Sequence, residues 1–216
     1  MSAHSSGVLL FKFRDDRLEV LLVHPGGPFW ARKEDVSWSI PKGRIEGDES
    51  PLDAAKREFR EETGFEVDGD FIDLGQSKQS SKKVVHIWAL EDDLDATKVS
   101  SNNFSVEWPK RSGIIREYPE IDRAGWFDIG QAKEKIQKGQ AVFIDRLIEA
   151  INYRHEKEIG LISDEKRESD LDSDLDRDQL ISEGRGDPPG KKAQGKGWRG
   201  HKRSPSQLSL TKWLHD

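Results

Sequence analysis

One short segment, PKGRIEGDESPLDAAKREFREETGF at residues 41–65, limits the fold of this chain more than any other feature of its sequence. Ser50 is a suitable helix N-cap, Pro51 suits the first helical position, and Asp53 stands three residues after the cap. Gly64 suits the C-terminal end of the same helix. The pattern therefore predicts a well-capped helix that follows a glycine-containing loop.

Glu58, Glu61 and Glu62 crowd one side of this predicted helix. At about 100° per residue, Glu62 lies about 40° to one side of Glu58 and Glu61 about 60° to the other, so the three share an arc of roughly 100°. Like charges at this spacing repel each other, and Mg²⁺ prefers oxygen ligands. An ordinary charged surface helix would explain Lys56 and Arg60, but not three acids on one arc. The segment therefore predicts a divalent-cation site.

The loop before the helix supplies the other parts of this expected site. Arg57 lies beside Glu61 on the helix, and Glu49 in the loop is also within its reach. A guanidinium held by carboxylates can fix the loop against the helix without being a ligand itself. Gly43 and Gly47 allow the loop to turn tightly and to bring its backbone close to a cation.

The segment resembles the signature of the Nudix hydrolases, a fixed spacing of glycine, glutamate, arginine and apolar residues. Every position of that signature is filled here, by Gly43, Glu49, Arg57, Glu58, Phe59, Glu61, Glu62, Gly64 and Phe65. The resemblance implies an α/β fold, an α/β/α sandwich with a mixed β-sheet, over residues 1–154. It also implies a pyrophosphohydrolase that uses Mg²⁺ or Mn²⁺ and cleaves a nucleoside diphosphate linked to another moiety.

The resemblance also implies roles for single residues. Glu58 and Glu62 are expected as the main metal ligands, with Glu61 as a further ligand or as the base for the attacking water. The Gly43 carbonyl is a further candidate ligand, and Glu49 with Arg57 is expected to orient the helix. Members of the family place the base on different residues, so its identity stays open.

Residues outside the signature bear on the substrate. Lys42 stands directly before the signature, in the sequence PKG. This lead into the signature is similar to that of members that act on diadenosine polyphosphates. Those members often carry a Tyr further along, and the corresponding stretch here, QSSKKVVHIW, has none. The best prediction is a dinucleoside polyphosphate or a nucleoside triphosphate. The alternatives are a sugar nucleotide, an RNA cap, or a binding module without catalysis, which the complete set of acids disfavours.

Further candidate contacts lie in other loops. The predicted substrate-binding residues are Lys42, Arg32, Lys33 and Trp30, although each cation taken singly is more often a solvated charge. Trp108 is another candidate for stacking a base, whereas a place in the core is favoured for Trp88. Glu120 stands at a position that resembles the one where many family members carry one more acid near the metals.

The C-terminal part has a different composition from the rest. Residues 156–187 contain twelve Asp or Glu against five Lys or Arg, whereas residues 188–216 contain one against seven. Such segments are poor in core-forming residues and are typical of disorder. We therefore expect a domain at 1–154 and a disordered tail, acidic then basic, at 155–216.

Composition excludes several classes of protein. The chain has no cysteine, so it has neither disulfides nor thiolate metal sites. Its first residues, MSAHSSGVLLFKF, lack the features of a signal peptide, and no apolar run is long enough for a membrane span. The net charge of -6 gives no general attraction to nucleic acid. We expect a cytoplasmic enzyme whose partner is a small nucleotide, and its oligomeric state stays open.

Overall fold

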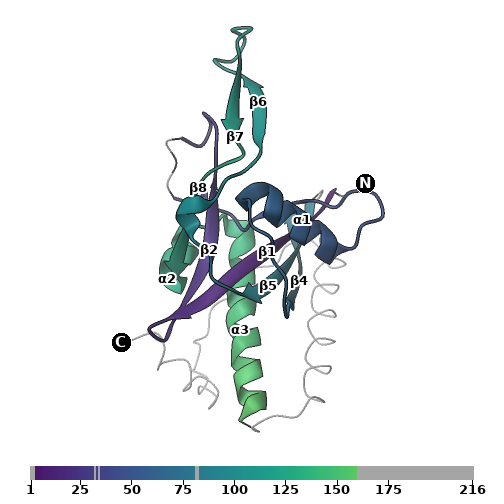
Figure 1. Cartoon of the computed structure of the whole chain (residues 1–216), viewed down its shortest axis with the longest axis vertical. Coiled ribbons are helices and arrows are strands. Elements are labelled where there is room, and N and C mark those ends of the chain that lie inside the picture. The colour runs from purple at the N-terminus through teal and green to yellow at the C-terminus, as the bar shows by residue number, and fades with distance from the viewer. Residues whose placement is uncertain (1–2, 32, 34, 81–82, 160–216) are drawn as a thin grey trace, which may run out of the picture. The chain divides into compact units, whose positions relative to one another are not determined.

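The computed structural model describes residues 3–31, 33, 35–80 and 83–159 (Figure 1). Its contacts divide the chain into two units, Met1–Arg154 and His155–Asp216, and the fold and the site belong to the first. Most of the predicted disordered tail, and Arg32 among the predicted site residues, lie outside the described residues.

A mixed sheet forms the centre of the first unit. Its strands follow the spatial order β4 (Ile72–Ser80), β5 (Lys83–Glu91), β1 (Ala3–Arg14), β2 (Arg17–Pro25) and β8 (Ile121–Asp128), and the short β3 (Lys42–Arg44) pairs beside β1. Strands β1 and β5 run parallel, whereas the other neighbours in this sheet are antiparallel. The predicted mixed sheet is therefore confirmed.

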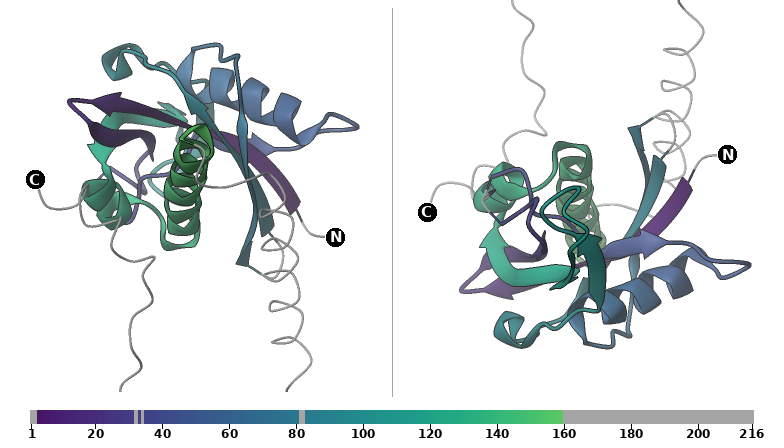
Figure 2. Two further views of the ribbon diagram at one scale, coloured as in Figure 1. Left: turned by 90° about the horizontal axis from the view of Figure 1, so that it is seen from below. Right: turned by 90° about the horizontal axis from the view of Figure 1, so that it is seen from above.

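Helices cover both faces of the sheet (Figure 2). On one face α1 (Pro51–Thr63) packs with Val8 and Leu10 of β1, and on the other α3 (Ala141–Glu158) packs with Leu9 and Phe11 of the same strand. Because β1 is buried on both faces, it reads as a continuous apolar run rather than as an alternation. The short α2 (Ile129–Lys135) lies on the α3 side, so the predicted α/β/α sandwich is confirmed.

Two segments lie outside the regular strands of the main sheet. The stretch WSIP at residues 38–41 forms only isolated bridges, from Ser39 to Val23 and from Trp38 to Ile136, and β3 follows it at once and pairs with β1. A hairpin of β6 (Asn103–Glu107) and β7 (Ile115–Pro119) also extends away from the main sheet (Figure 1). No helix in the described ranges combines the length and the apolar character needed to cross a bilayer.

Candidate functional site

The helix α1 has the caps that its sequence predicts. The Ser50 hydroxyl accepts a hydrogen bond from the Asp53 N–H at 3.1 Å, and Pro51 occupies the first turn. Gly64 adopts a φ of 79°, which favours glycine, and its N–H donates to the Arg60 carbonyl at 2.7 Å. The predicted helix and both of its ends are therefore confirmed.

The packing of α1 places its glutamates at the edge of the core. Ala54, Ala55, Phe59 and Thr63 are fully buried against the sheet. The Glu58 side chain, next to Phe59, is 14% exposed, and the Glu61 side chain is 36% exposed. These carboxylates therefore lie where water screens their charges only in part.

Arg57 joins the helix to the loop before it. Its guanidinium donates to both oxygens of Glu49, at 2.7 and 3.2 Å, and to the Arg44 carbonyl at 2.8 Å. It also donates to Glu58 at 2.9 Å and to Glu61 at 3.2 Å. The Arg57 hydrogen bond, together with the Glu46 N–H, holds the pKa of the Glu49 carboxyl below its usual range. One side chain therefore fixes both the loop and the carboxylate arc.

Gly43 lies directly against the Glu58 carboxylate. A Cβ added at Gly43 would sit 1.8 Å from Glu58 Oε2, so a larger residue here would displace this carboxylate. In the same strand, the Lys42 N–H donates to Glu62 Oε2 at 3.0 Å. Strand β3 therefore brings its backbone against two of the three carboxylates on the predicted arc.

The electrostatics of these acids show an excess of negative charge. Burial raises the pKa of the Glu62 carboxyl to about 7, and Glu58 and Glu120 add to that rise against the opposing Lys42. Burial also raises the pKa of Glu58, with Glu61 and Glu120 acting in the same direction and Arg57 against them. An added cation would relieve this repulsion and favour the ionised forms.

Glu120 belongs to the same electrostatic group although it is distant in sequence. Its backbone N–H donates to the Asn102 carbonyl at 2.8 Å, and the Asn102 N–H donates to the Glu61 carbonyl at 3.1 Å. Burial and the charge of Glu61 raise the pKa of the Glu120 carboxyl. The base of the hairpin is therefore tied to the end of α1, and it adds a fourth acid to the site.

The residues present fit a divalent cation, although they do not yet form a closed ligand set. Among the described residues, no three acid or histidine side chains already converge as ligands of one ion. The donors nevertheless have the right chemistry, since they are carboxylate and backbone oxygens, which Mg²⁺ and Mn²⁺ prefer. The Glu58 carboxylate itself occupies the space that a Cβ at Gly43 would fill, so it lies directly against the β3 backbone.

Lys42 sits in a crowded position beside β1. It pairs with Gly7 of that strand, and a Cβ added at Gly7 would lie 2.4 Å from the Lys42 Cβ. Burial lowers the pKa of the Lys42 ammonium, Glu62 opposes this shift, and Lys83 adds to it. The predicted phosphate contact at Lys42 is therefore next to Glu62, and a second cation lies near it.

The loop after β2 holds the other predicted substrate contacts that the structure describes. The Lys33 ammonium lies over the Trp30 ring, 4.7 Å from its centroid. Phe29, which is 42% exposed, packs edge-on against Trp108 of the hairpin at 5.1 Å, and Lys110 lies over the Phe29 ring. Two aromatic groups with a cation over them therefore lie in this region, Trp30 with Lys33 and the exposed Phe29, which pairs with Trp108.

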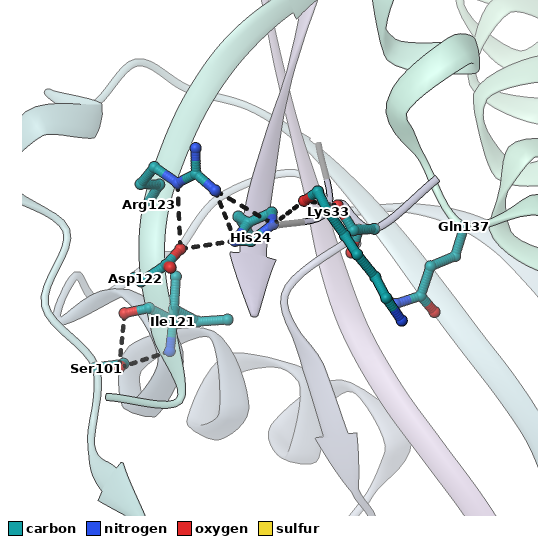
Figure 3. A network of polar contacts seen from close by, with 8 residues as sticks. His24, Lys33, Ser101, Ile121, Asp122, Arg123 and Gln137 are labelled. Carbon is teal, nitrogen blue, oxygen red and sulfur yellow. Dashed lines mark hydrogen bonds and ion pairs between the residues drawn. The ribbon is translucent and has the colours of Figure 1, made fainter. Parts of the chain in front are cut away.

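Sequence reasoning missed a polar network at the start of this loop. His24, buried on β2, contacts Asp122 of β8 and the Lys33 carbonyl (Figure 3). The only signal in the sequence is a histidine at the end of an apolar run, which by itself more often indicates a satisfied core residue. Trp88 is in the position favoured for it, since it packs beside the cluster under α1 and stacks on His86 at 4.7 Å.

The sequence of this chain is similar to a known domain family and to several known proteins. The sequence profile of the NUDIX domain matches residues 3–147. An uncharacterized 17.7 kDa protein of Enterobacteria phage T4 is 52% identical over 88 residues, which cover 39% of this chain and 57% of that protein. An RNA pyrophosphohydrolase of Xanthomonas campestris is 43% identical over 54 residues, which cover 24% of this chain and 26% of that enzyme.

Solved structures give similar matches. The NUDIX domain of Shewanella oneidensis NrtR complexed with ADP ribose matches with a TM-score of 0.47 and 17% identity, over 70% of this chain and 89% of that one. The C. elegans Ap4A hydrolase matches with a TM-score of 0.48 and 16% identity, over 69% of this chain and 98% of that one.

The extent of these matches differs between the relatives and the family profile. This chain covers only 25% and 57% of the length of the first two curated relatives, so their activities are not assigned to it. The profile match, by contrast, spans well over half of the 216 residues and includes the whole glutamate helix. The chain therefore belongs to the NUDIX domain family.

Proposed function

We propose that this protein is a pyrophosphohydrolase that depends on Mg²⁺ or Mn²⁺ and cleaves a nucleoside diphosphate linked to another moiety. The observation that carries the proposal is the contact of the Glu58 carboxylate with the Gly43 backbone, beside the buried Glu62. Members of the family generally use divalent cations, and the acids here are coupled in the way that a cation would relieve.

The residues of the site have separate tasks in this proposal. Glu58 and Glu62 hold the cation, with Glu61 and the Gly43 carbonyl as further ligands. The cation, when bound, neutralises the diphosphate and lowers the pKa of a bound water. Arg57 keeps the ligands in place through Glu49, and Glu120 adds a carboxylate close enough to Glu61 to shift its own pKa. The base that activates the water is Glu61 or another of these acids.

The basic and aromatic residues favour a substrate with several phosphates. Lys42 adjoins Glu62, and Lys33 lies in the neighbouring loop, so the site offers more positive charge than a simple diphosphate requires. Phe29 and Trp108 then offer a surface on which a second base can stack. A dinucleoside polyphosphate is therefore the leading candidate, ahead of a nucleoside triphosphate.

A hydrolysis screen tests the proposed activity. The purified chain is assayed with Mg²⁺ and with Mn²⁺ against nucleoside triphosphates, diadenosine tetraphosphate, sugar nucleotides and 5′-triphosphate RNA. Glu58→Gln and Glu62→Gln serve as site variants, and Glu66→Gln, whose side chain is 84% exposed, is the matched control. We expect metal-dependent turnover that both site variants lose and the control retains. Nucleotide binding without turnover on any substrate would instead identify a binding module.

A matched pair of substrates tests the role of the aromatic pair. Diadenosine tetraphosphate and adenosine tetraphosphate carry the same phosphates and differ only in the second nucleoside. Stacking on an aromatic side chain contributes about 1–3 kcal/mol. Trp108→Ala should therefore lower kcat/KM for the first substrate at least about fivefold and leave the second unchanged. Equal losses on both substrates, or a sugar nucleotide that outperforms both tenfold, would contradict the polyphosphate assignment.

A further inference from the structure

A buried histidine connects the substrate-side loop to strand β8 (Figure 3). The His24 side chain is 0% exposed. Its Nδ1 lies 2.7 Å from Asp122 Oδ1, and its Nε2 lies 2.7 Å from the Lys33 carbonyl oxygen. A carboxylate and a carbonyl can only accept hydrogen bonds, so both ring nitrogens must donate. With Asp122 ionised, the two contacts call for two N–H groups, which the imidazolium form of histidine has.

A neutral ring would not satisfy both partners. It carries one N–H, so a nitrogen lone pair would face an oxygen at 2.7 Å in a fully buried place. An unsatisfied buried acceptor costs about 1–3 kcal/mol. A neutral His24 is therefore expected to release one of its two partners, and Lys33, in a loop, is the one that can move.

Two charged side chains among the described residues contact the ring, an acid that favours its charged form and a guanidinium that opposes it. Asp122 is the carboxylate in contact, and Arg123 Nη2 lies 3.2 and 3.3 Å from the two ring nitrogens. Equal distances to both nitrogens place that guanidinium over the ring face rather than in its plane. Arg123 also reaches Asp122 at 3.4 Å, and Trp38 packs edge-on against the ring at 5.3 Å. Asp122 is thus shared between the His24 ring and the Arg123 guanidinium.

An irregularity of the sheet makes this contact possible. Arg123 pairs with His24 and Ile121 pairs with Pro25, so Asp122 is an extra residue on β8 without a cross-strand partner. Such a bulge turns a side chain out of the regular alternation of a strand. Here it turns Asp122 to the side of the sheet on which His24 lies.

The partner of Nε2 sets the position of a predicted substrate contact. The Lys33 carbonyl also accepts from the Ser37 hydroxyl at 3.0 Å, and the Lys33 N–H donates to the Trp30 carbonyl at 2.8 Å. With its backbone held on both sides, Lys33 keeps its ammonium over the Trp30 ring. The same loop begins at Gly26, whose N–H donates to the Glu120 carbonyl at 2.8 Å.

We propose that His24 is a positioning residue, an imidazolium that holds the Lys33 segment of the loop after β2 against β8 and so presents Lys33 to the substrate. The structural part of this proposal stands alone, whereas the effect on substrate binding rests on the function proposed above. Loss of either hydrogen bond frees the loop, and a partly populated binding-competent loop raises KM without changing the chemical step.

The protonation of His24 is measured on the unmodified full-length chain, so this test does not depend on a variant that folds. Nitrogen-15 NMR of the histidine rings at pH 7 should show two protonated nitrogens on His24. A lone-pair nitrogen on His24 at that pH would overturn the proposal, because the proton would then lie on Asp122 or be absent.

Loop mobility and kinetics provide two more readouts. His24→Asn and His24→Phe are compared with His86→Asn, which removes the other partly buried histidine–aspartate pair, His86 with Asp73 at 2.6 Å. Loss of a hydrogen bond from a charged donor predicts about tenfold faster amide exchange in the described residues of this loop, 26–31, 33 and 35–37. KM for the best polyphosphate should rise about tenfold in the His24 variants, with kcat within about twofold of the original enzyme.

The outcomes separate this proposal from the proposed function. Faster exchange with an unchanged KM would refute the positioning role, although the enzyme would remain a hydrolase. Exchange in both His24 variants equal to that of the unmodified chain would refute the hydrogen-bonded attachment of the loop itself. Absence of turnover in the unmodified chain would count against the proposed function alone, because the NMR and exchange results do not depend on activity.

Discussion

Replacing Arg57 by Lys should separate the geometric role of this residue from its charge. The guanidinium makes hydrogen bonds to both Glu49 oxygens, to Glu58, to Glu61 and to the Arg44 carbonyl. A lysine keeps the positive charge but offers one compact ammonium, which cannot reproduce a planar fork that reaches both the loop and the helix. The Arg57→Lys change therefore removes geometry and leaves the net charge unaltered.

The structure allows a rough magnitude for this change. The Arg57 side chain is 23% exposed and that of Glu49 is 20% exposed, so solvent weakens these contacts only in part. A hydrogen bond between charged groups contributes about 1.5–3 kcal/mol, and such losses within one network do not add fully. We expect a loss of about 2–4 kcal/mol of unfolding free energy. Because the carboxylates also lose their alignment, kcat should fall at least about tenfold.

Urea denaturation and steady-state kinetics measure both effects. With a slope of about 2 kcal/mol per M, the loss shifts the urea midpoint by roughly 1–2 M. Arg60→Lys is the control, because Arg60 lies on the same helix, is 56% exposed and meets Glu66 only at 3.8 Å. The control should change the unfolding free energy by less than about 0.5 kcal/mol. If Arg57→Lys behaves like Arg60→Lys, the guanidinium does not organise the site.

Three further predictions follow from the same residues. Folding raises the pKa of Glu62 from 4.5 to about 7, so the stability that its protonated form contributes is present below pH 4.5 and is lost as pH rises to about 7. In thermal melts without metal, Glu62→Gln should therefore lose less stability over that range than the unmodified chain. In Gly43→Ala the added Cβ would displace the Glu58 carboxylate, so Mg²⁺ should no longer raise the melting temperature. Gly47→Ala lowers the starting melting temperature because Gly47 has a φ of 54°, but its added Cβ meets no other atom within 4 Å, and the variant should still respond to Mg²⁺. A chain that ends after Glu158 keeps all of α3 and should retain its melting temperature and turnover, because residues 160–216 are poor in core-forming side chains; a clear loss of either would show that the tail contributes to the domain.

The local parts of the site were predictable from the sequence. The caps of α1 depend on Ser50 and Gly64, which lie next to the helix in the chain, and the contact of Arg57 with Glu49 spans only eight residues. Signals of this kind depend on backbone geometry over one or two helical turns. Spacing alone was therefore enough to predict them.

The parts built from distant segments were not predictable in the same way. His24 meets Asp122 across 98 residues, and the contact requires a bulge in β8 that no residue pattern announces. The pairing of Phe29 with Trp108 likewise depends on a hairpin that the sequence analysis did not predict. Lone side chains of these types occur in many cores and surfaces, so their roles emerge only when the sheet brings them together.

Calorimetric titration with Mg²⁺ at pH 7, repeated in buffers of different ionisation enthalpy, tests the central claim most directly. Since the pKa of Glu62 is raised to about 7, the account predicts that binding of a cation releases about half a proton from this carboxyl. Glu62→Gln should bind Mg²⁺ more weakly and release no such proton, whereas Glu66→Gln should match the unmodified chain. Mg²⁺ binding by Glu58→Gln and Glu62→Gln that equals the original in affinity and proton release would contradict the assignment of the metal site to this helix.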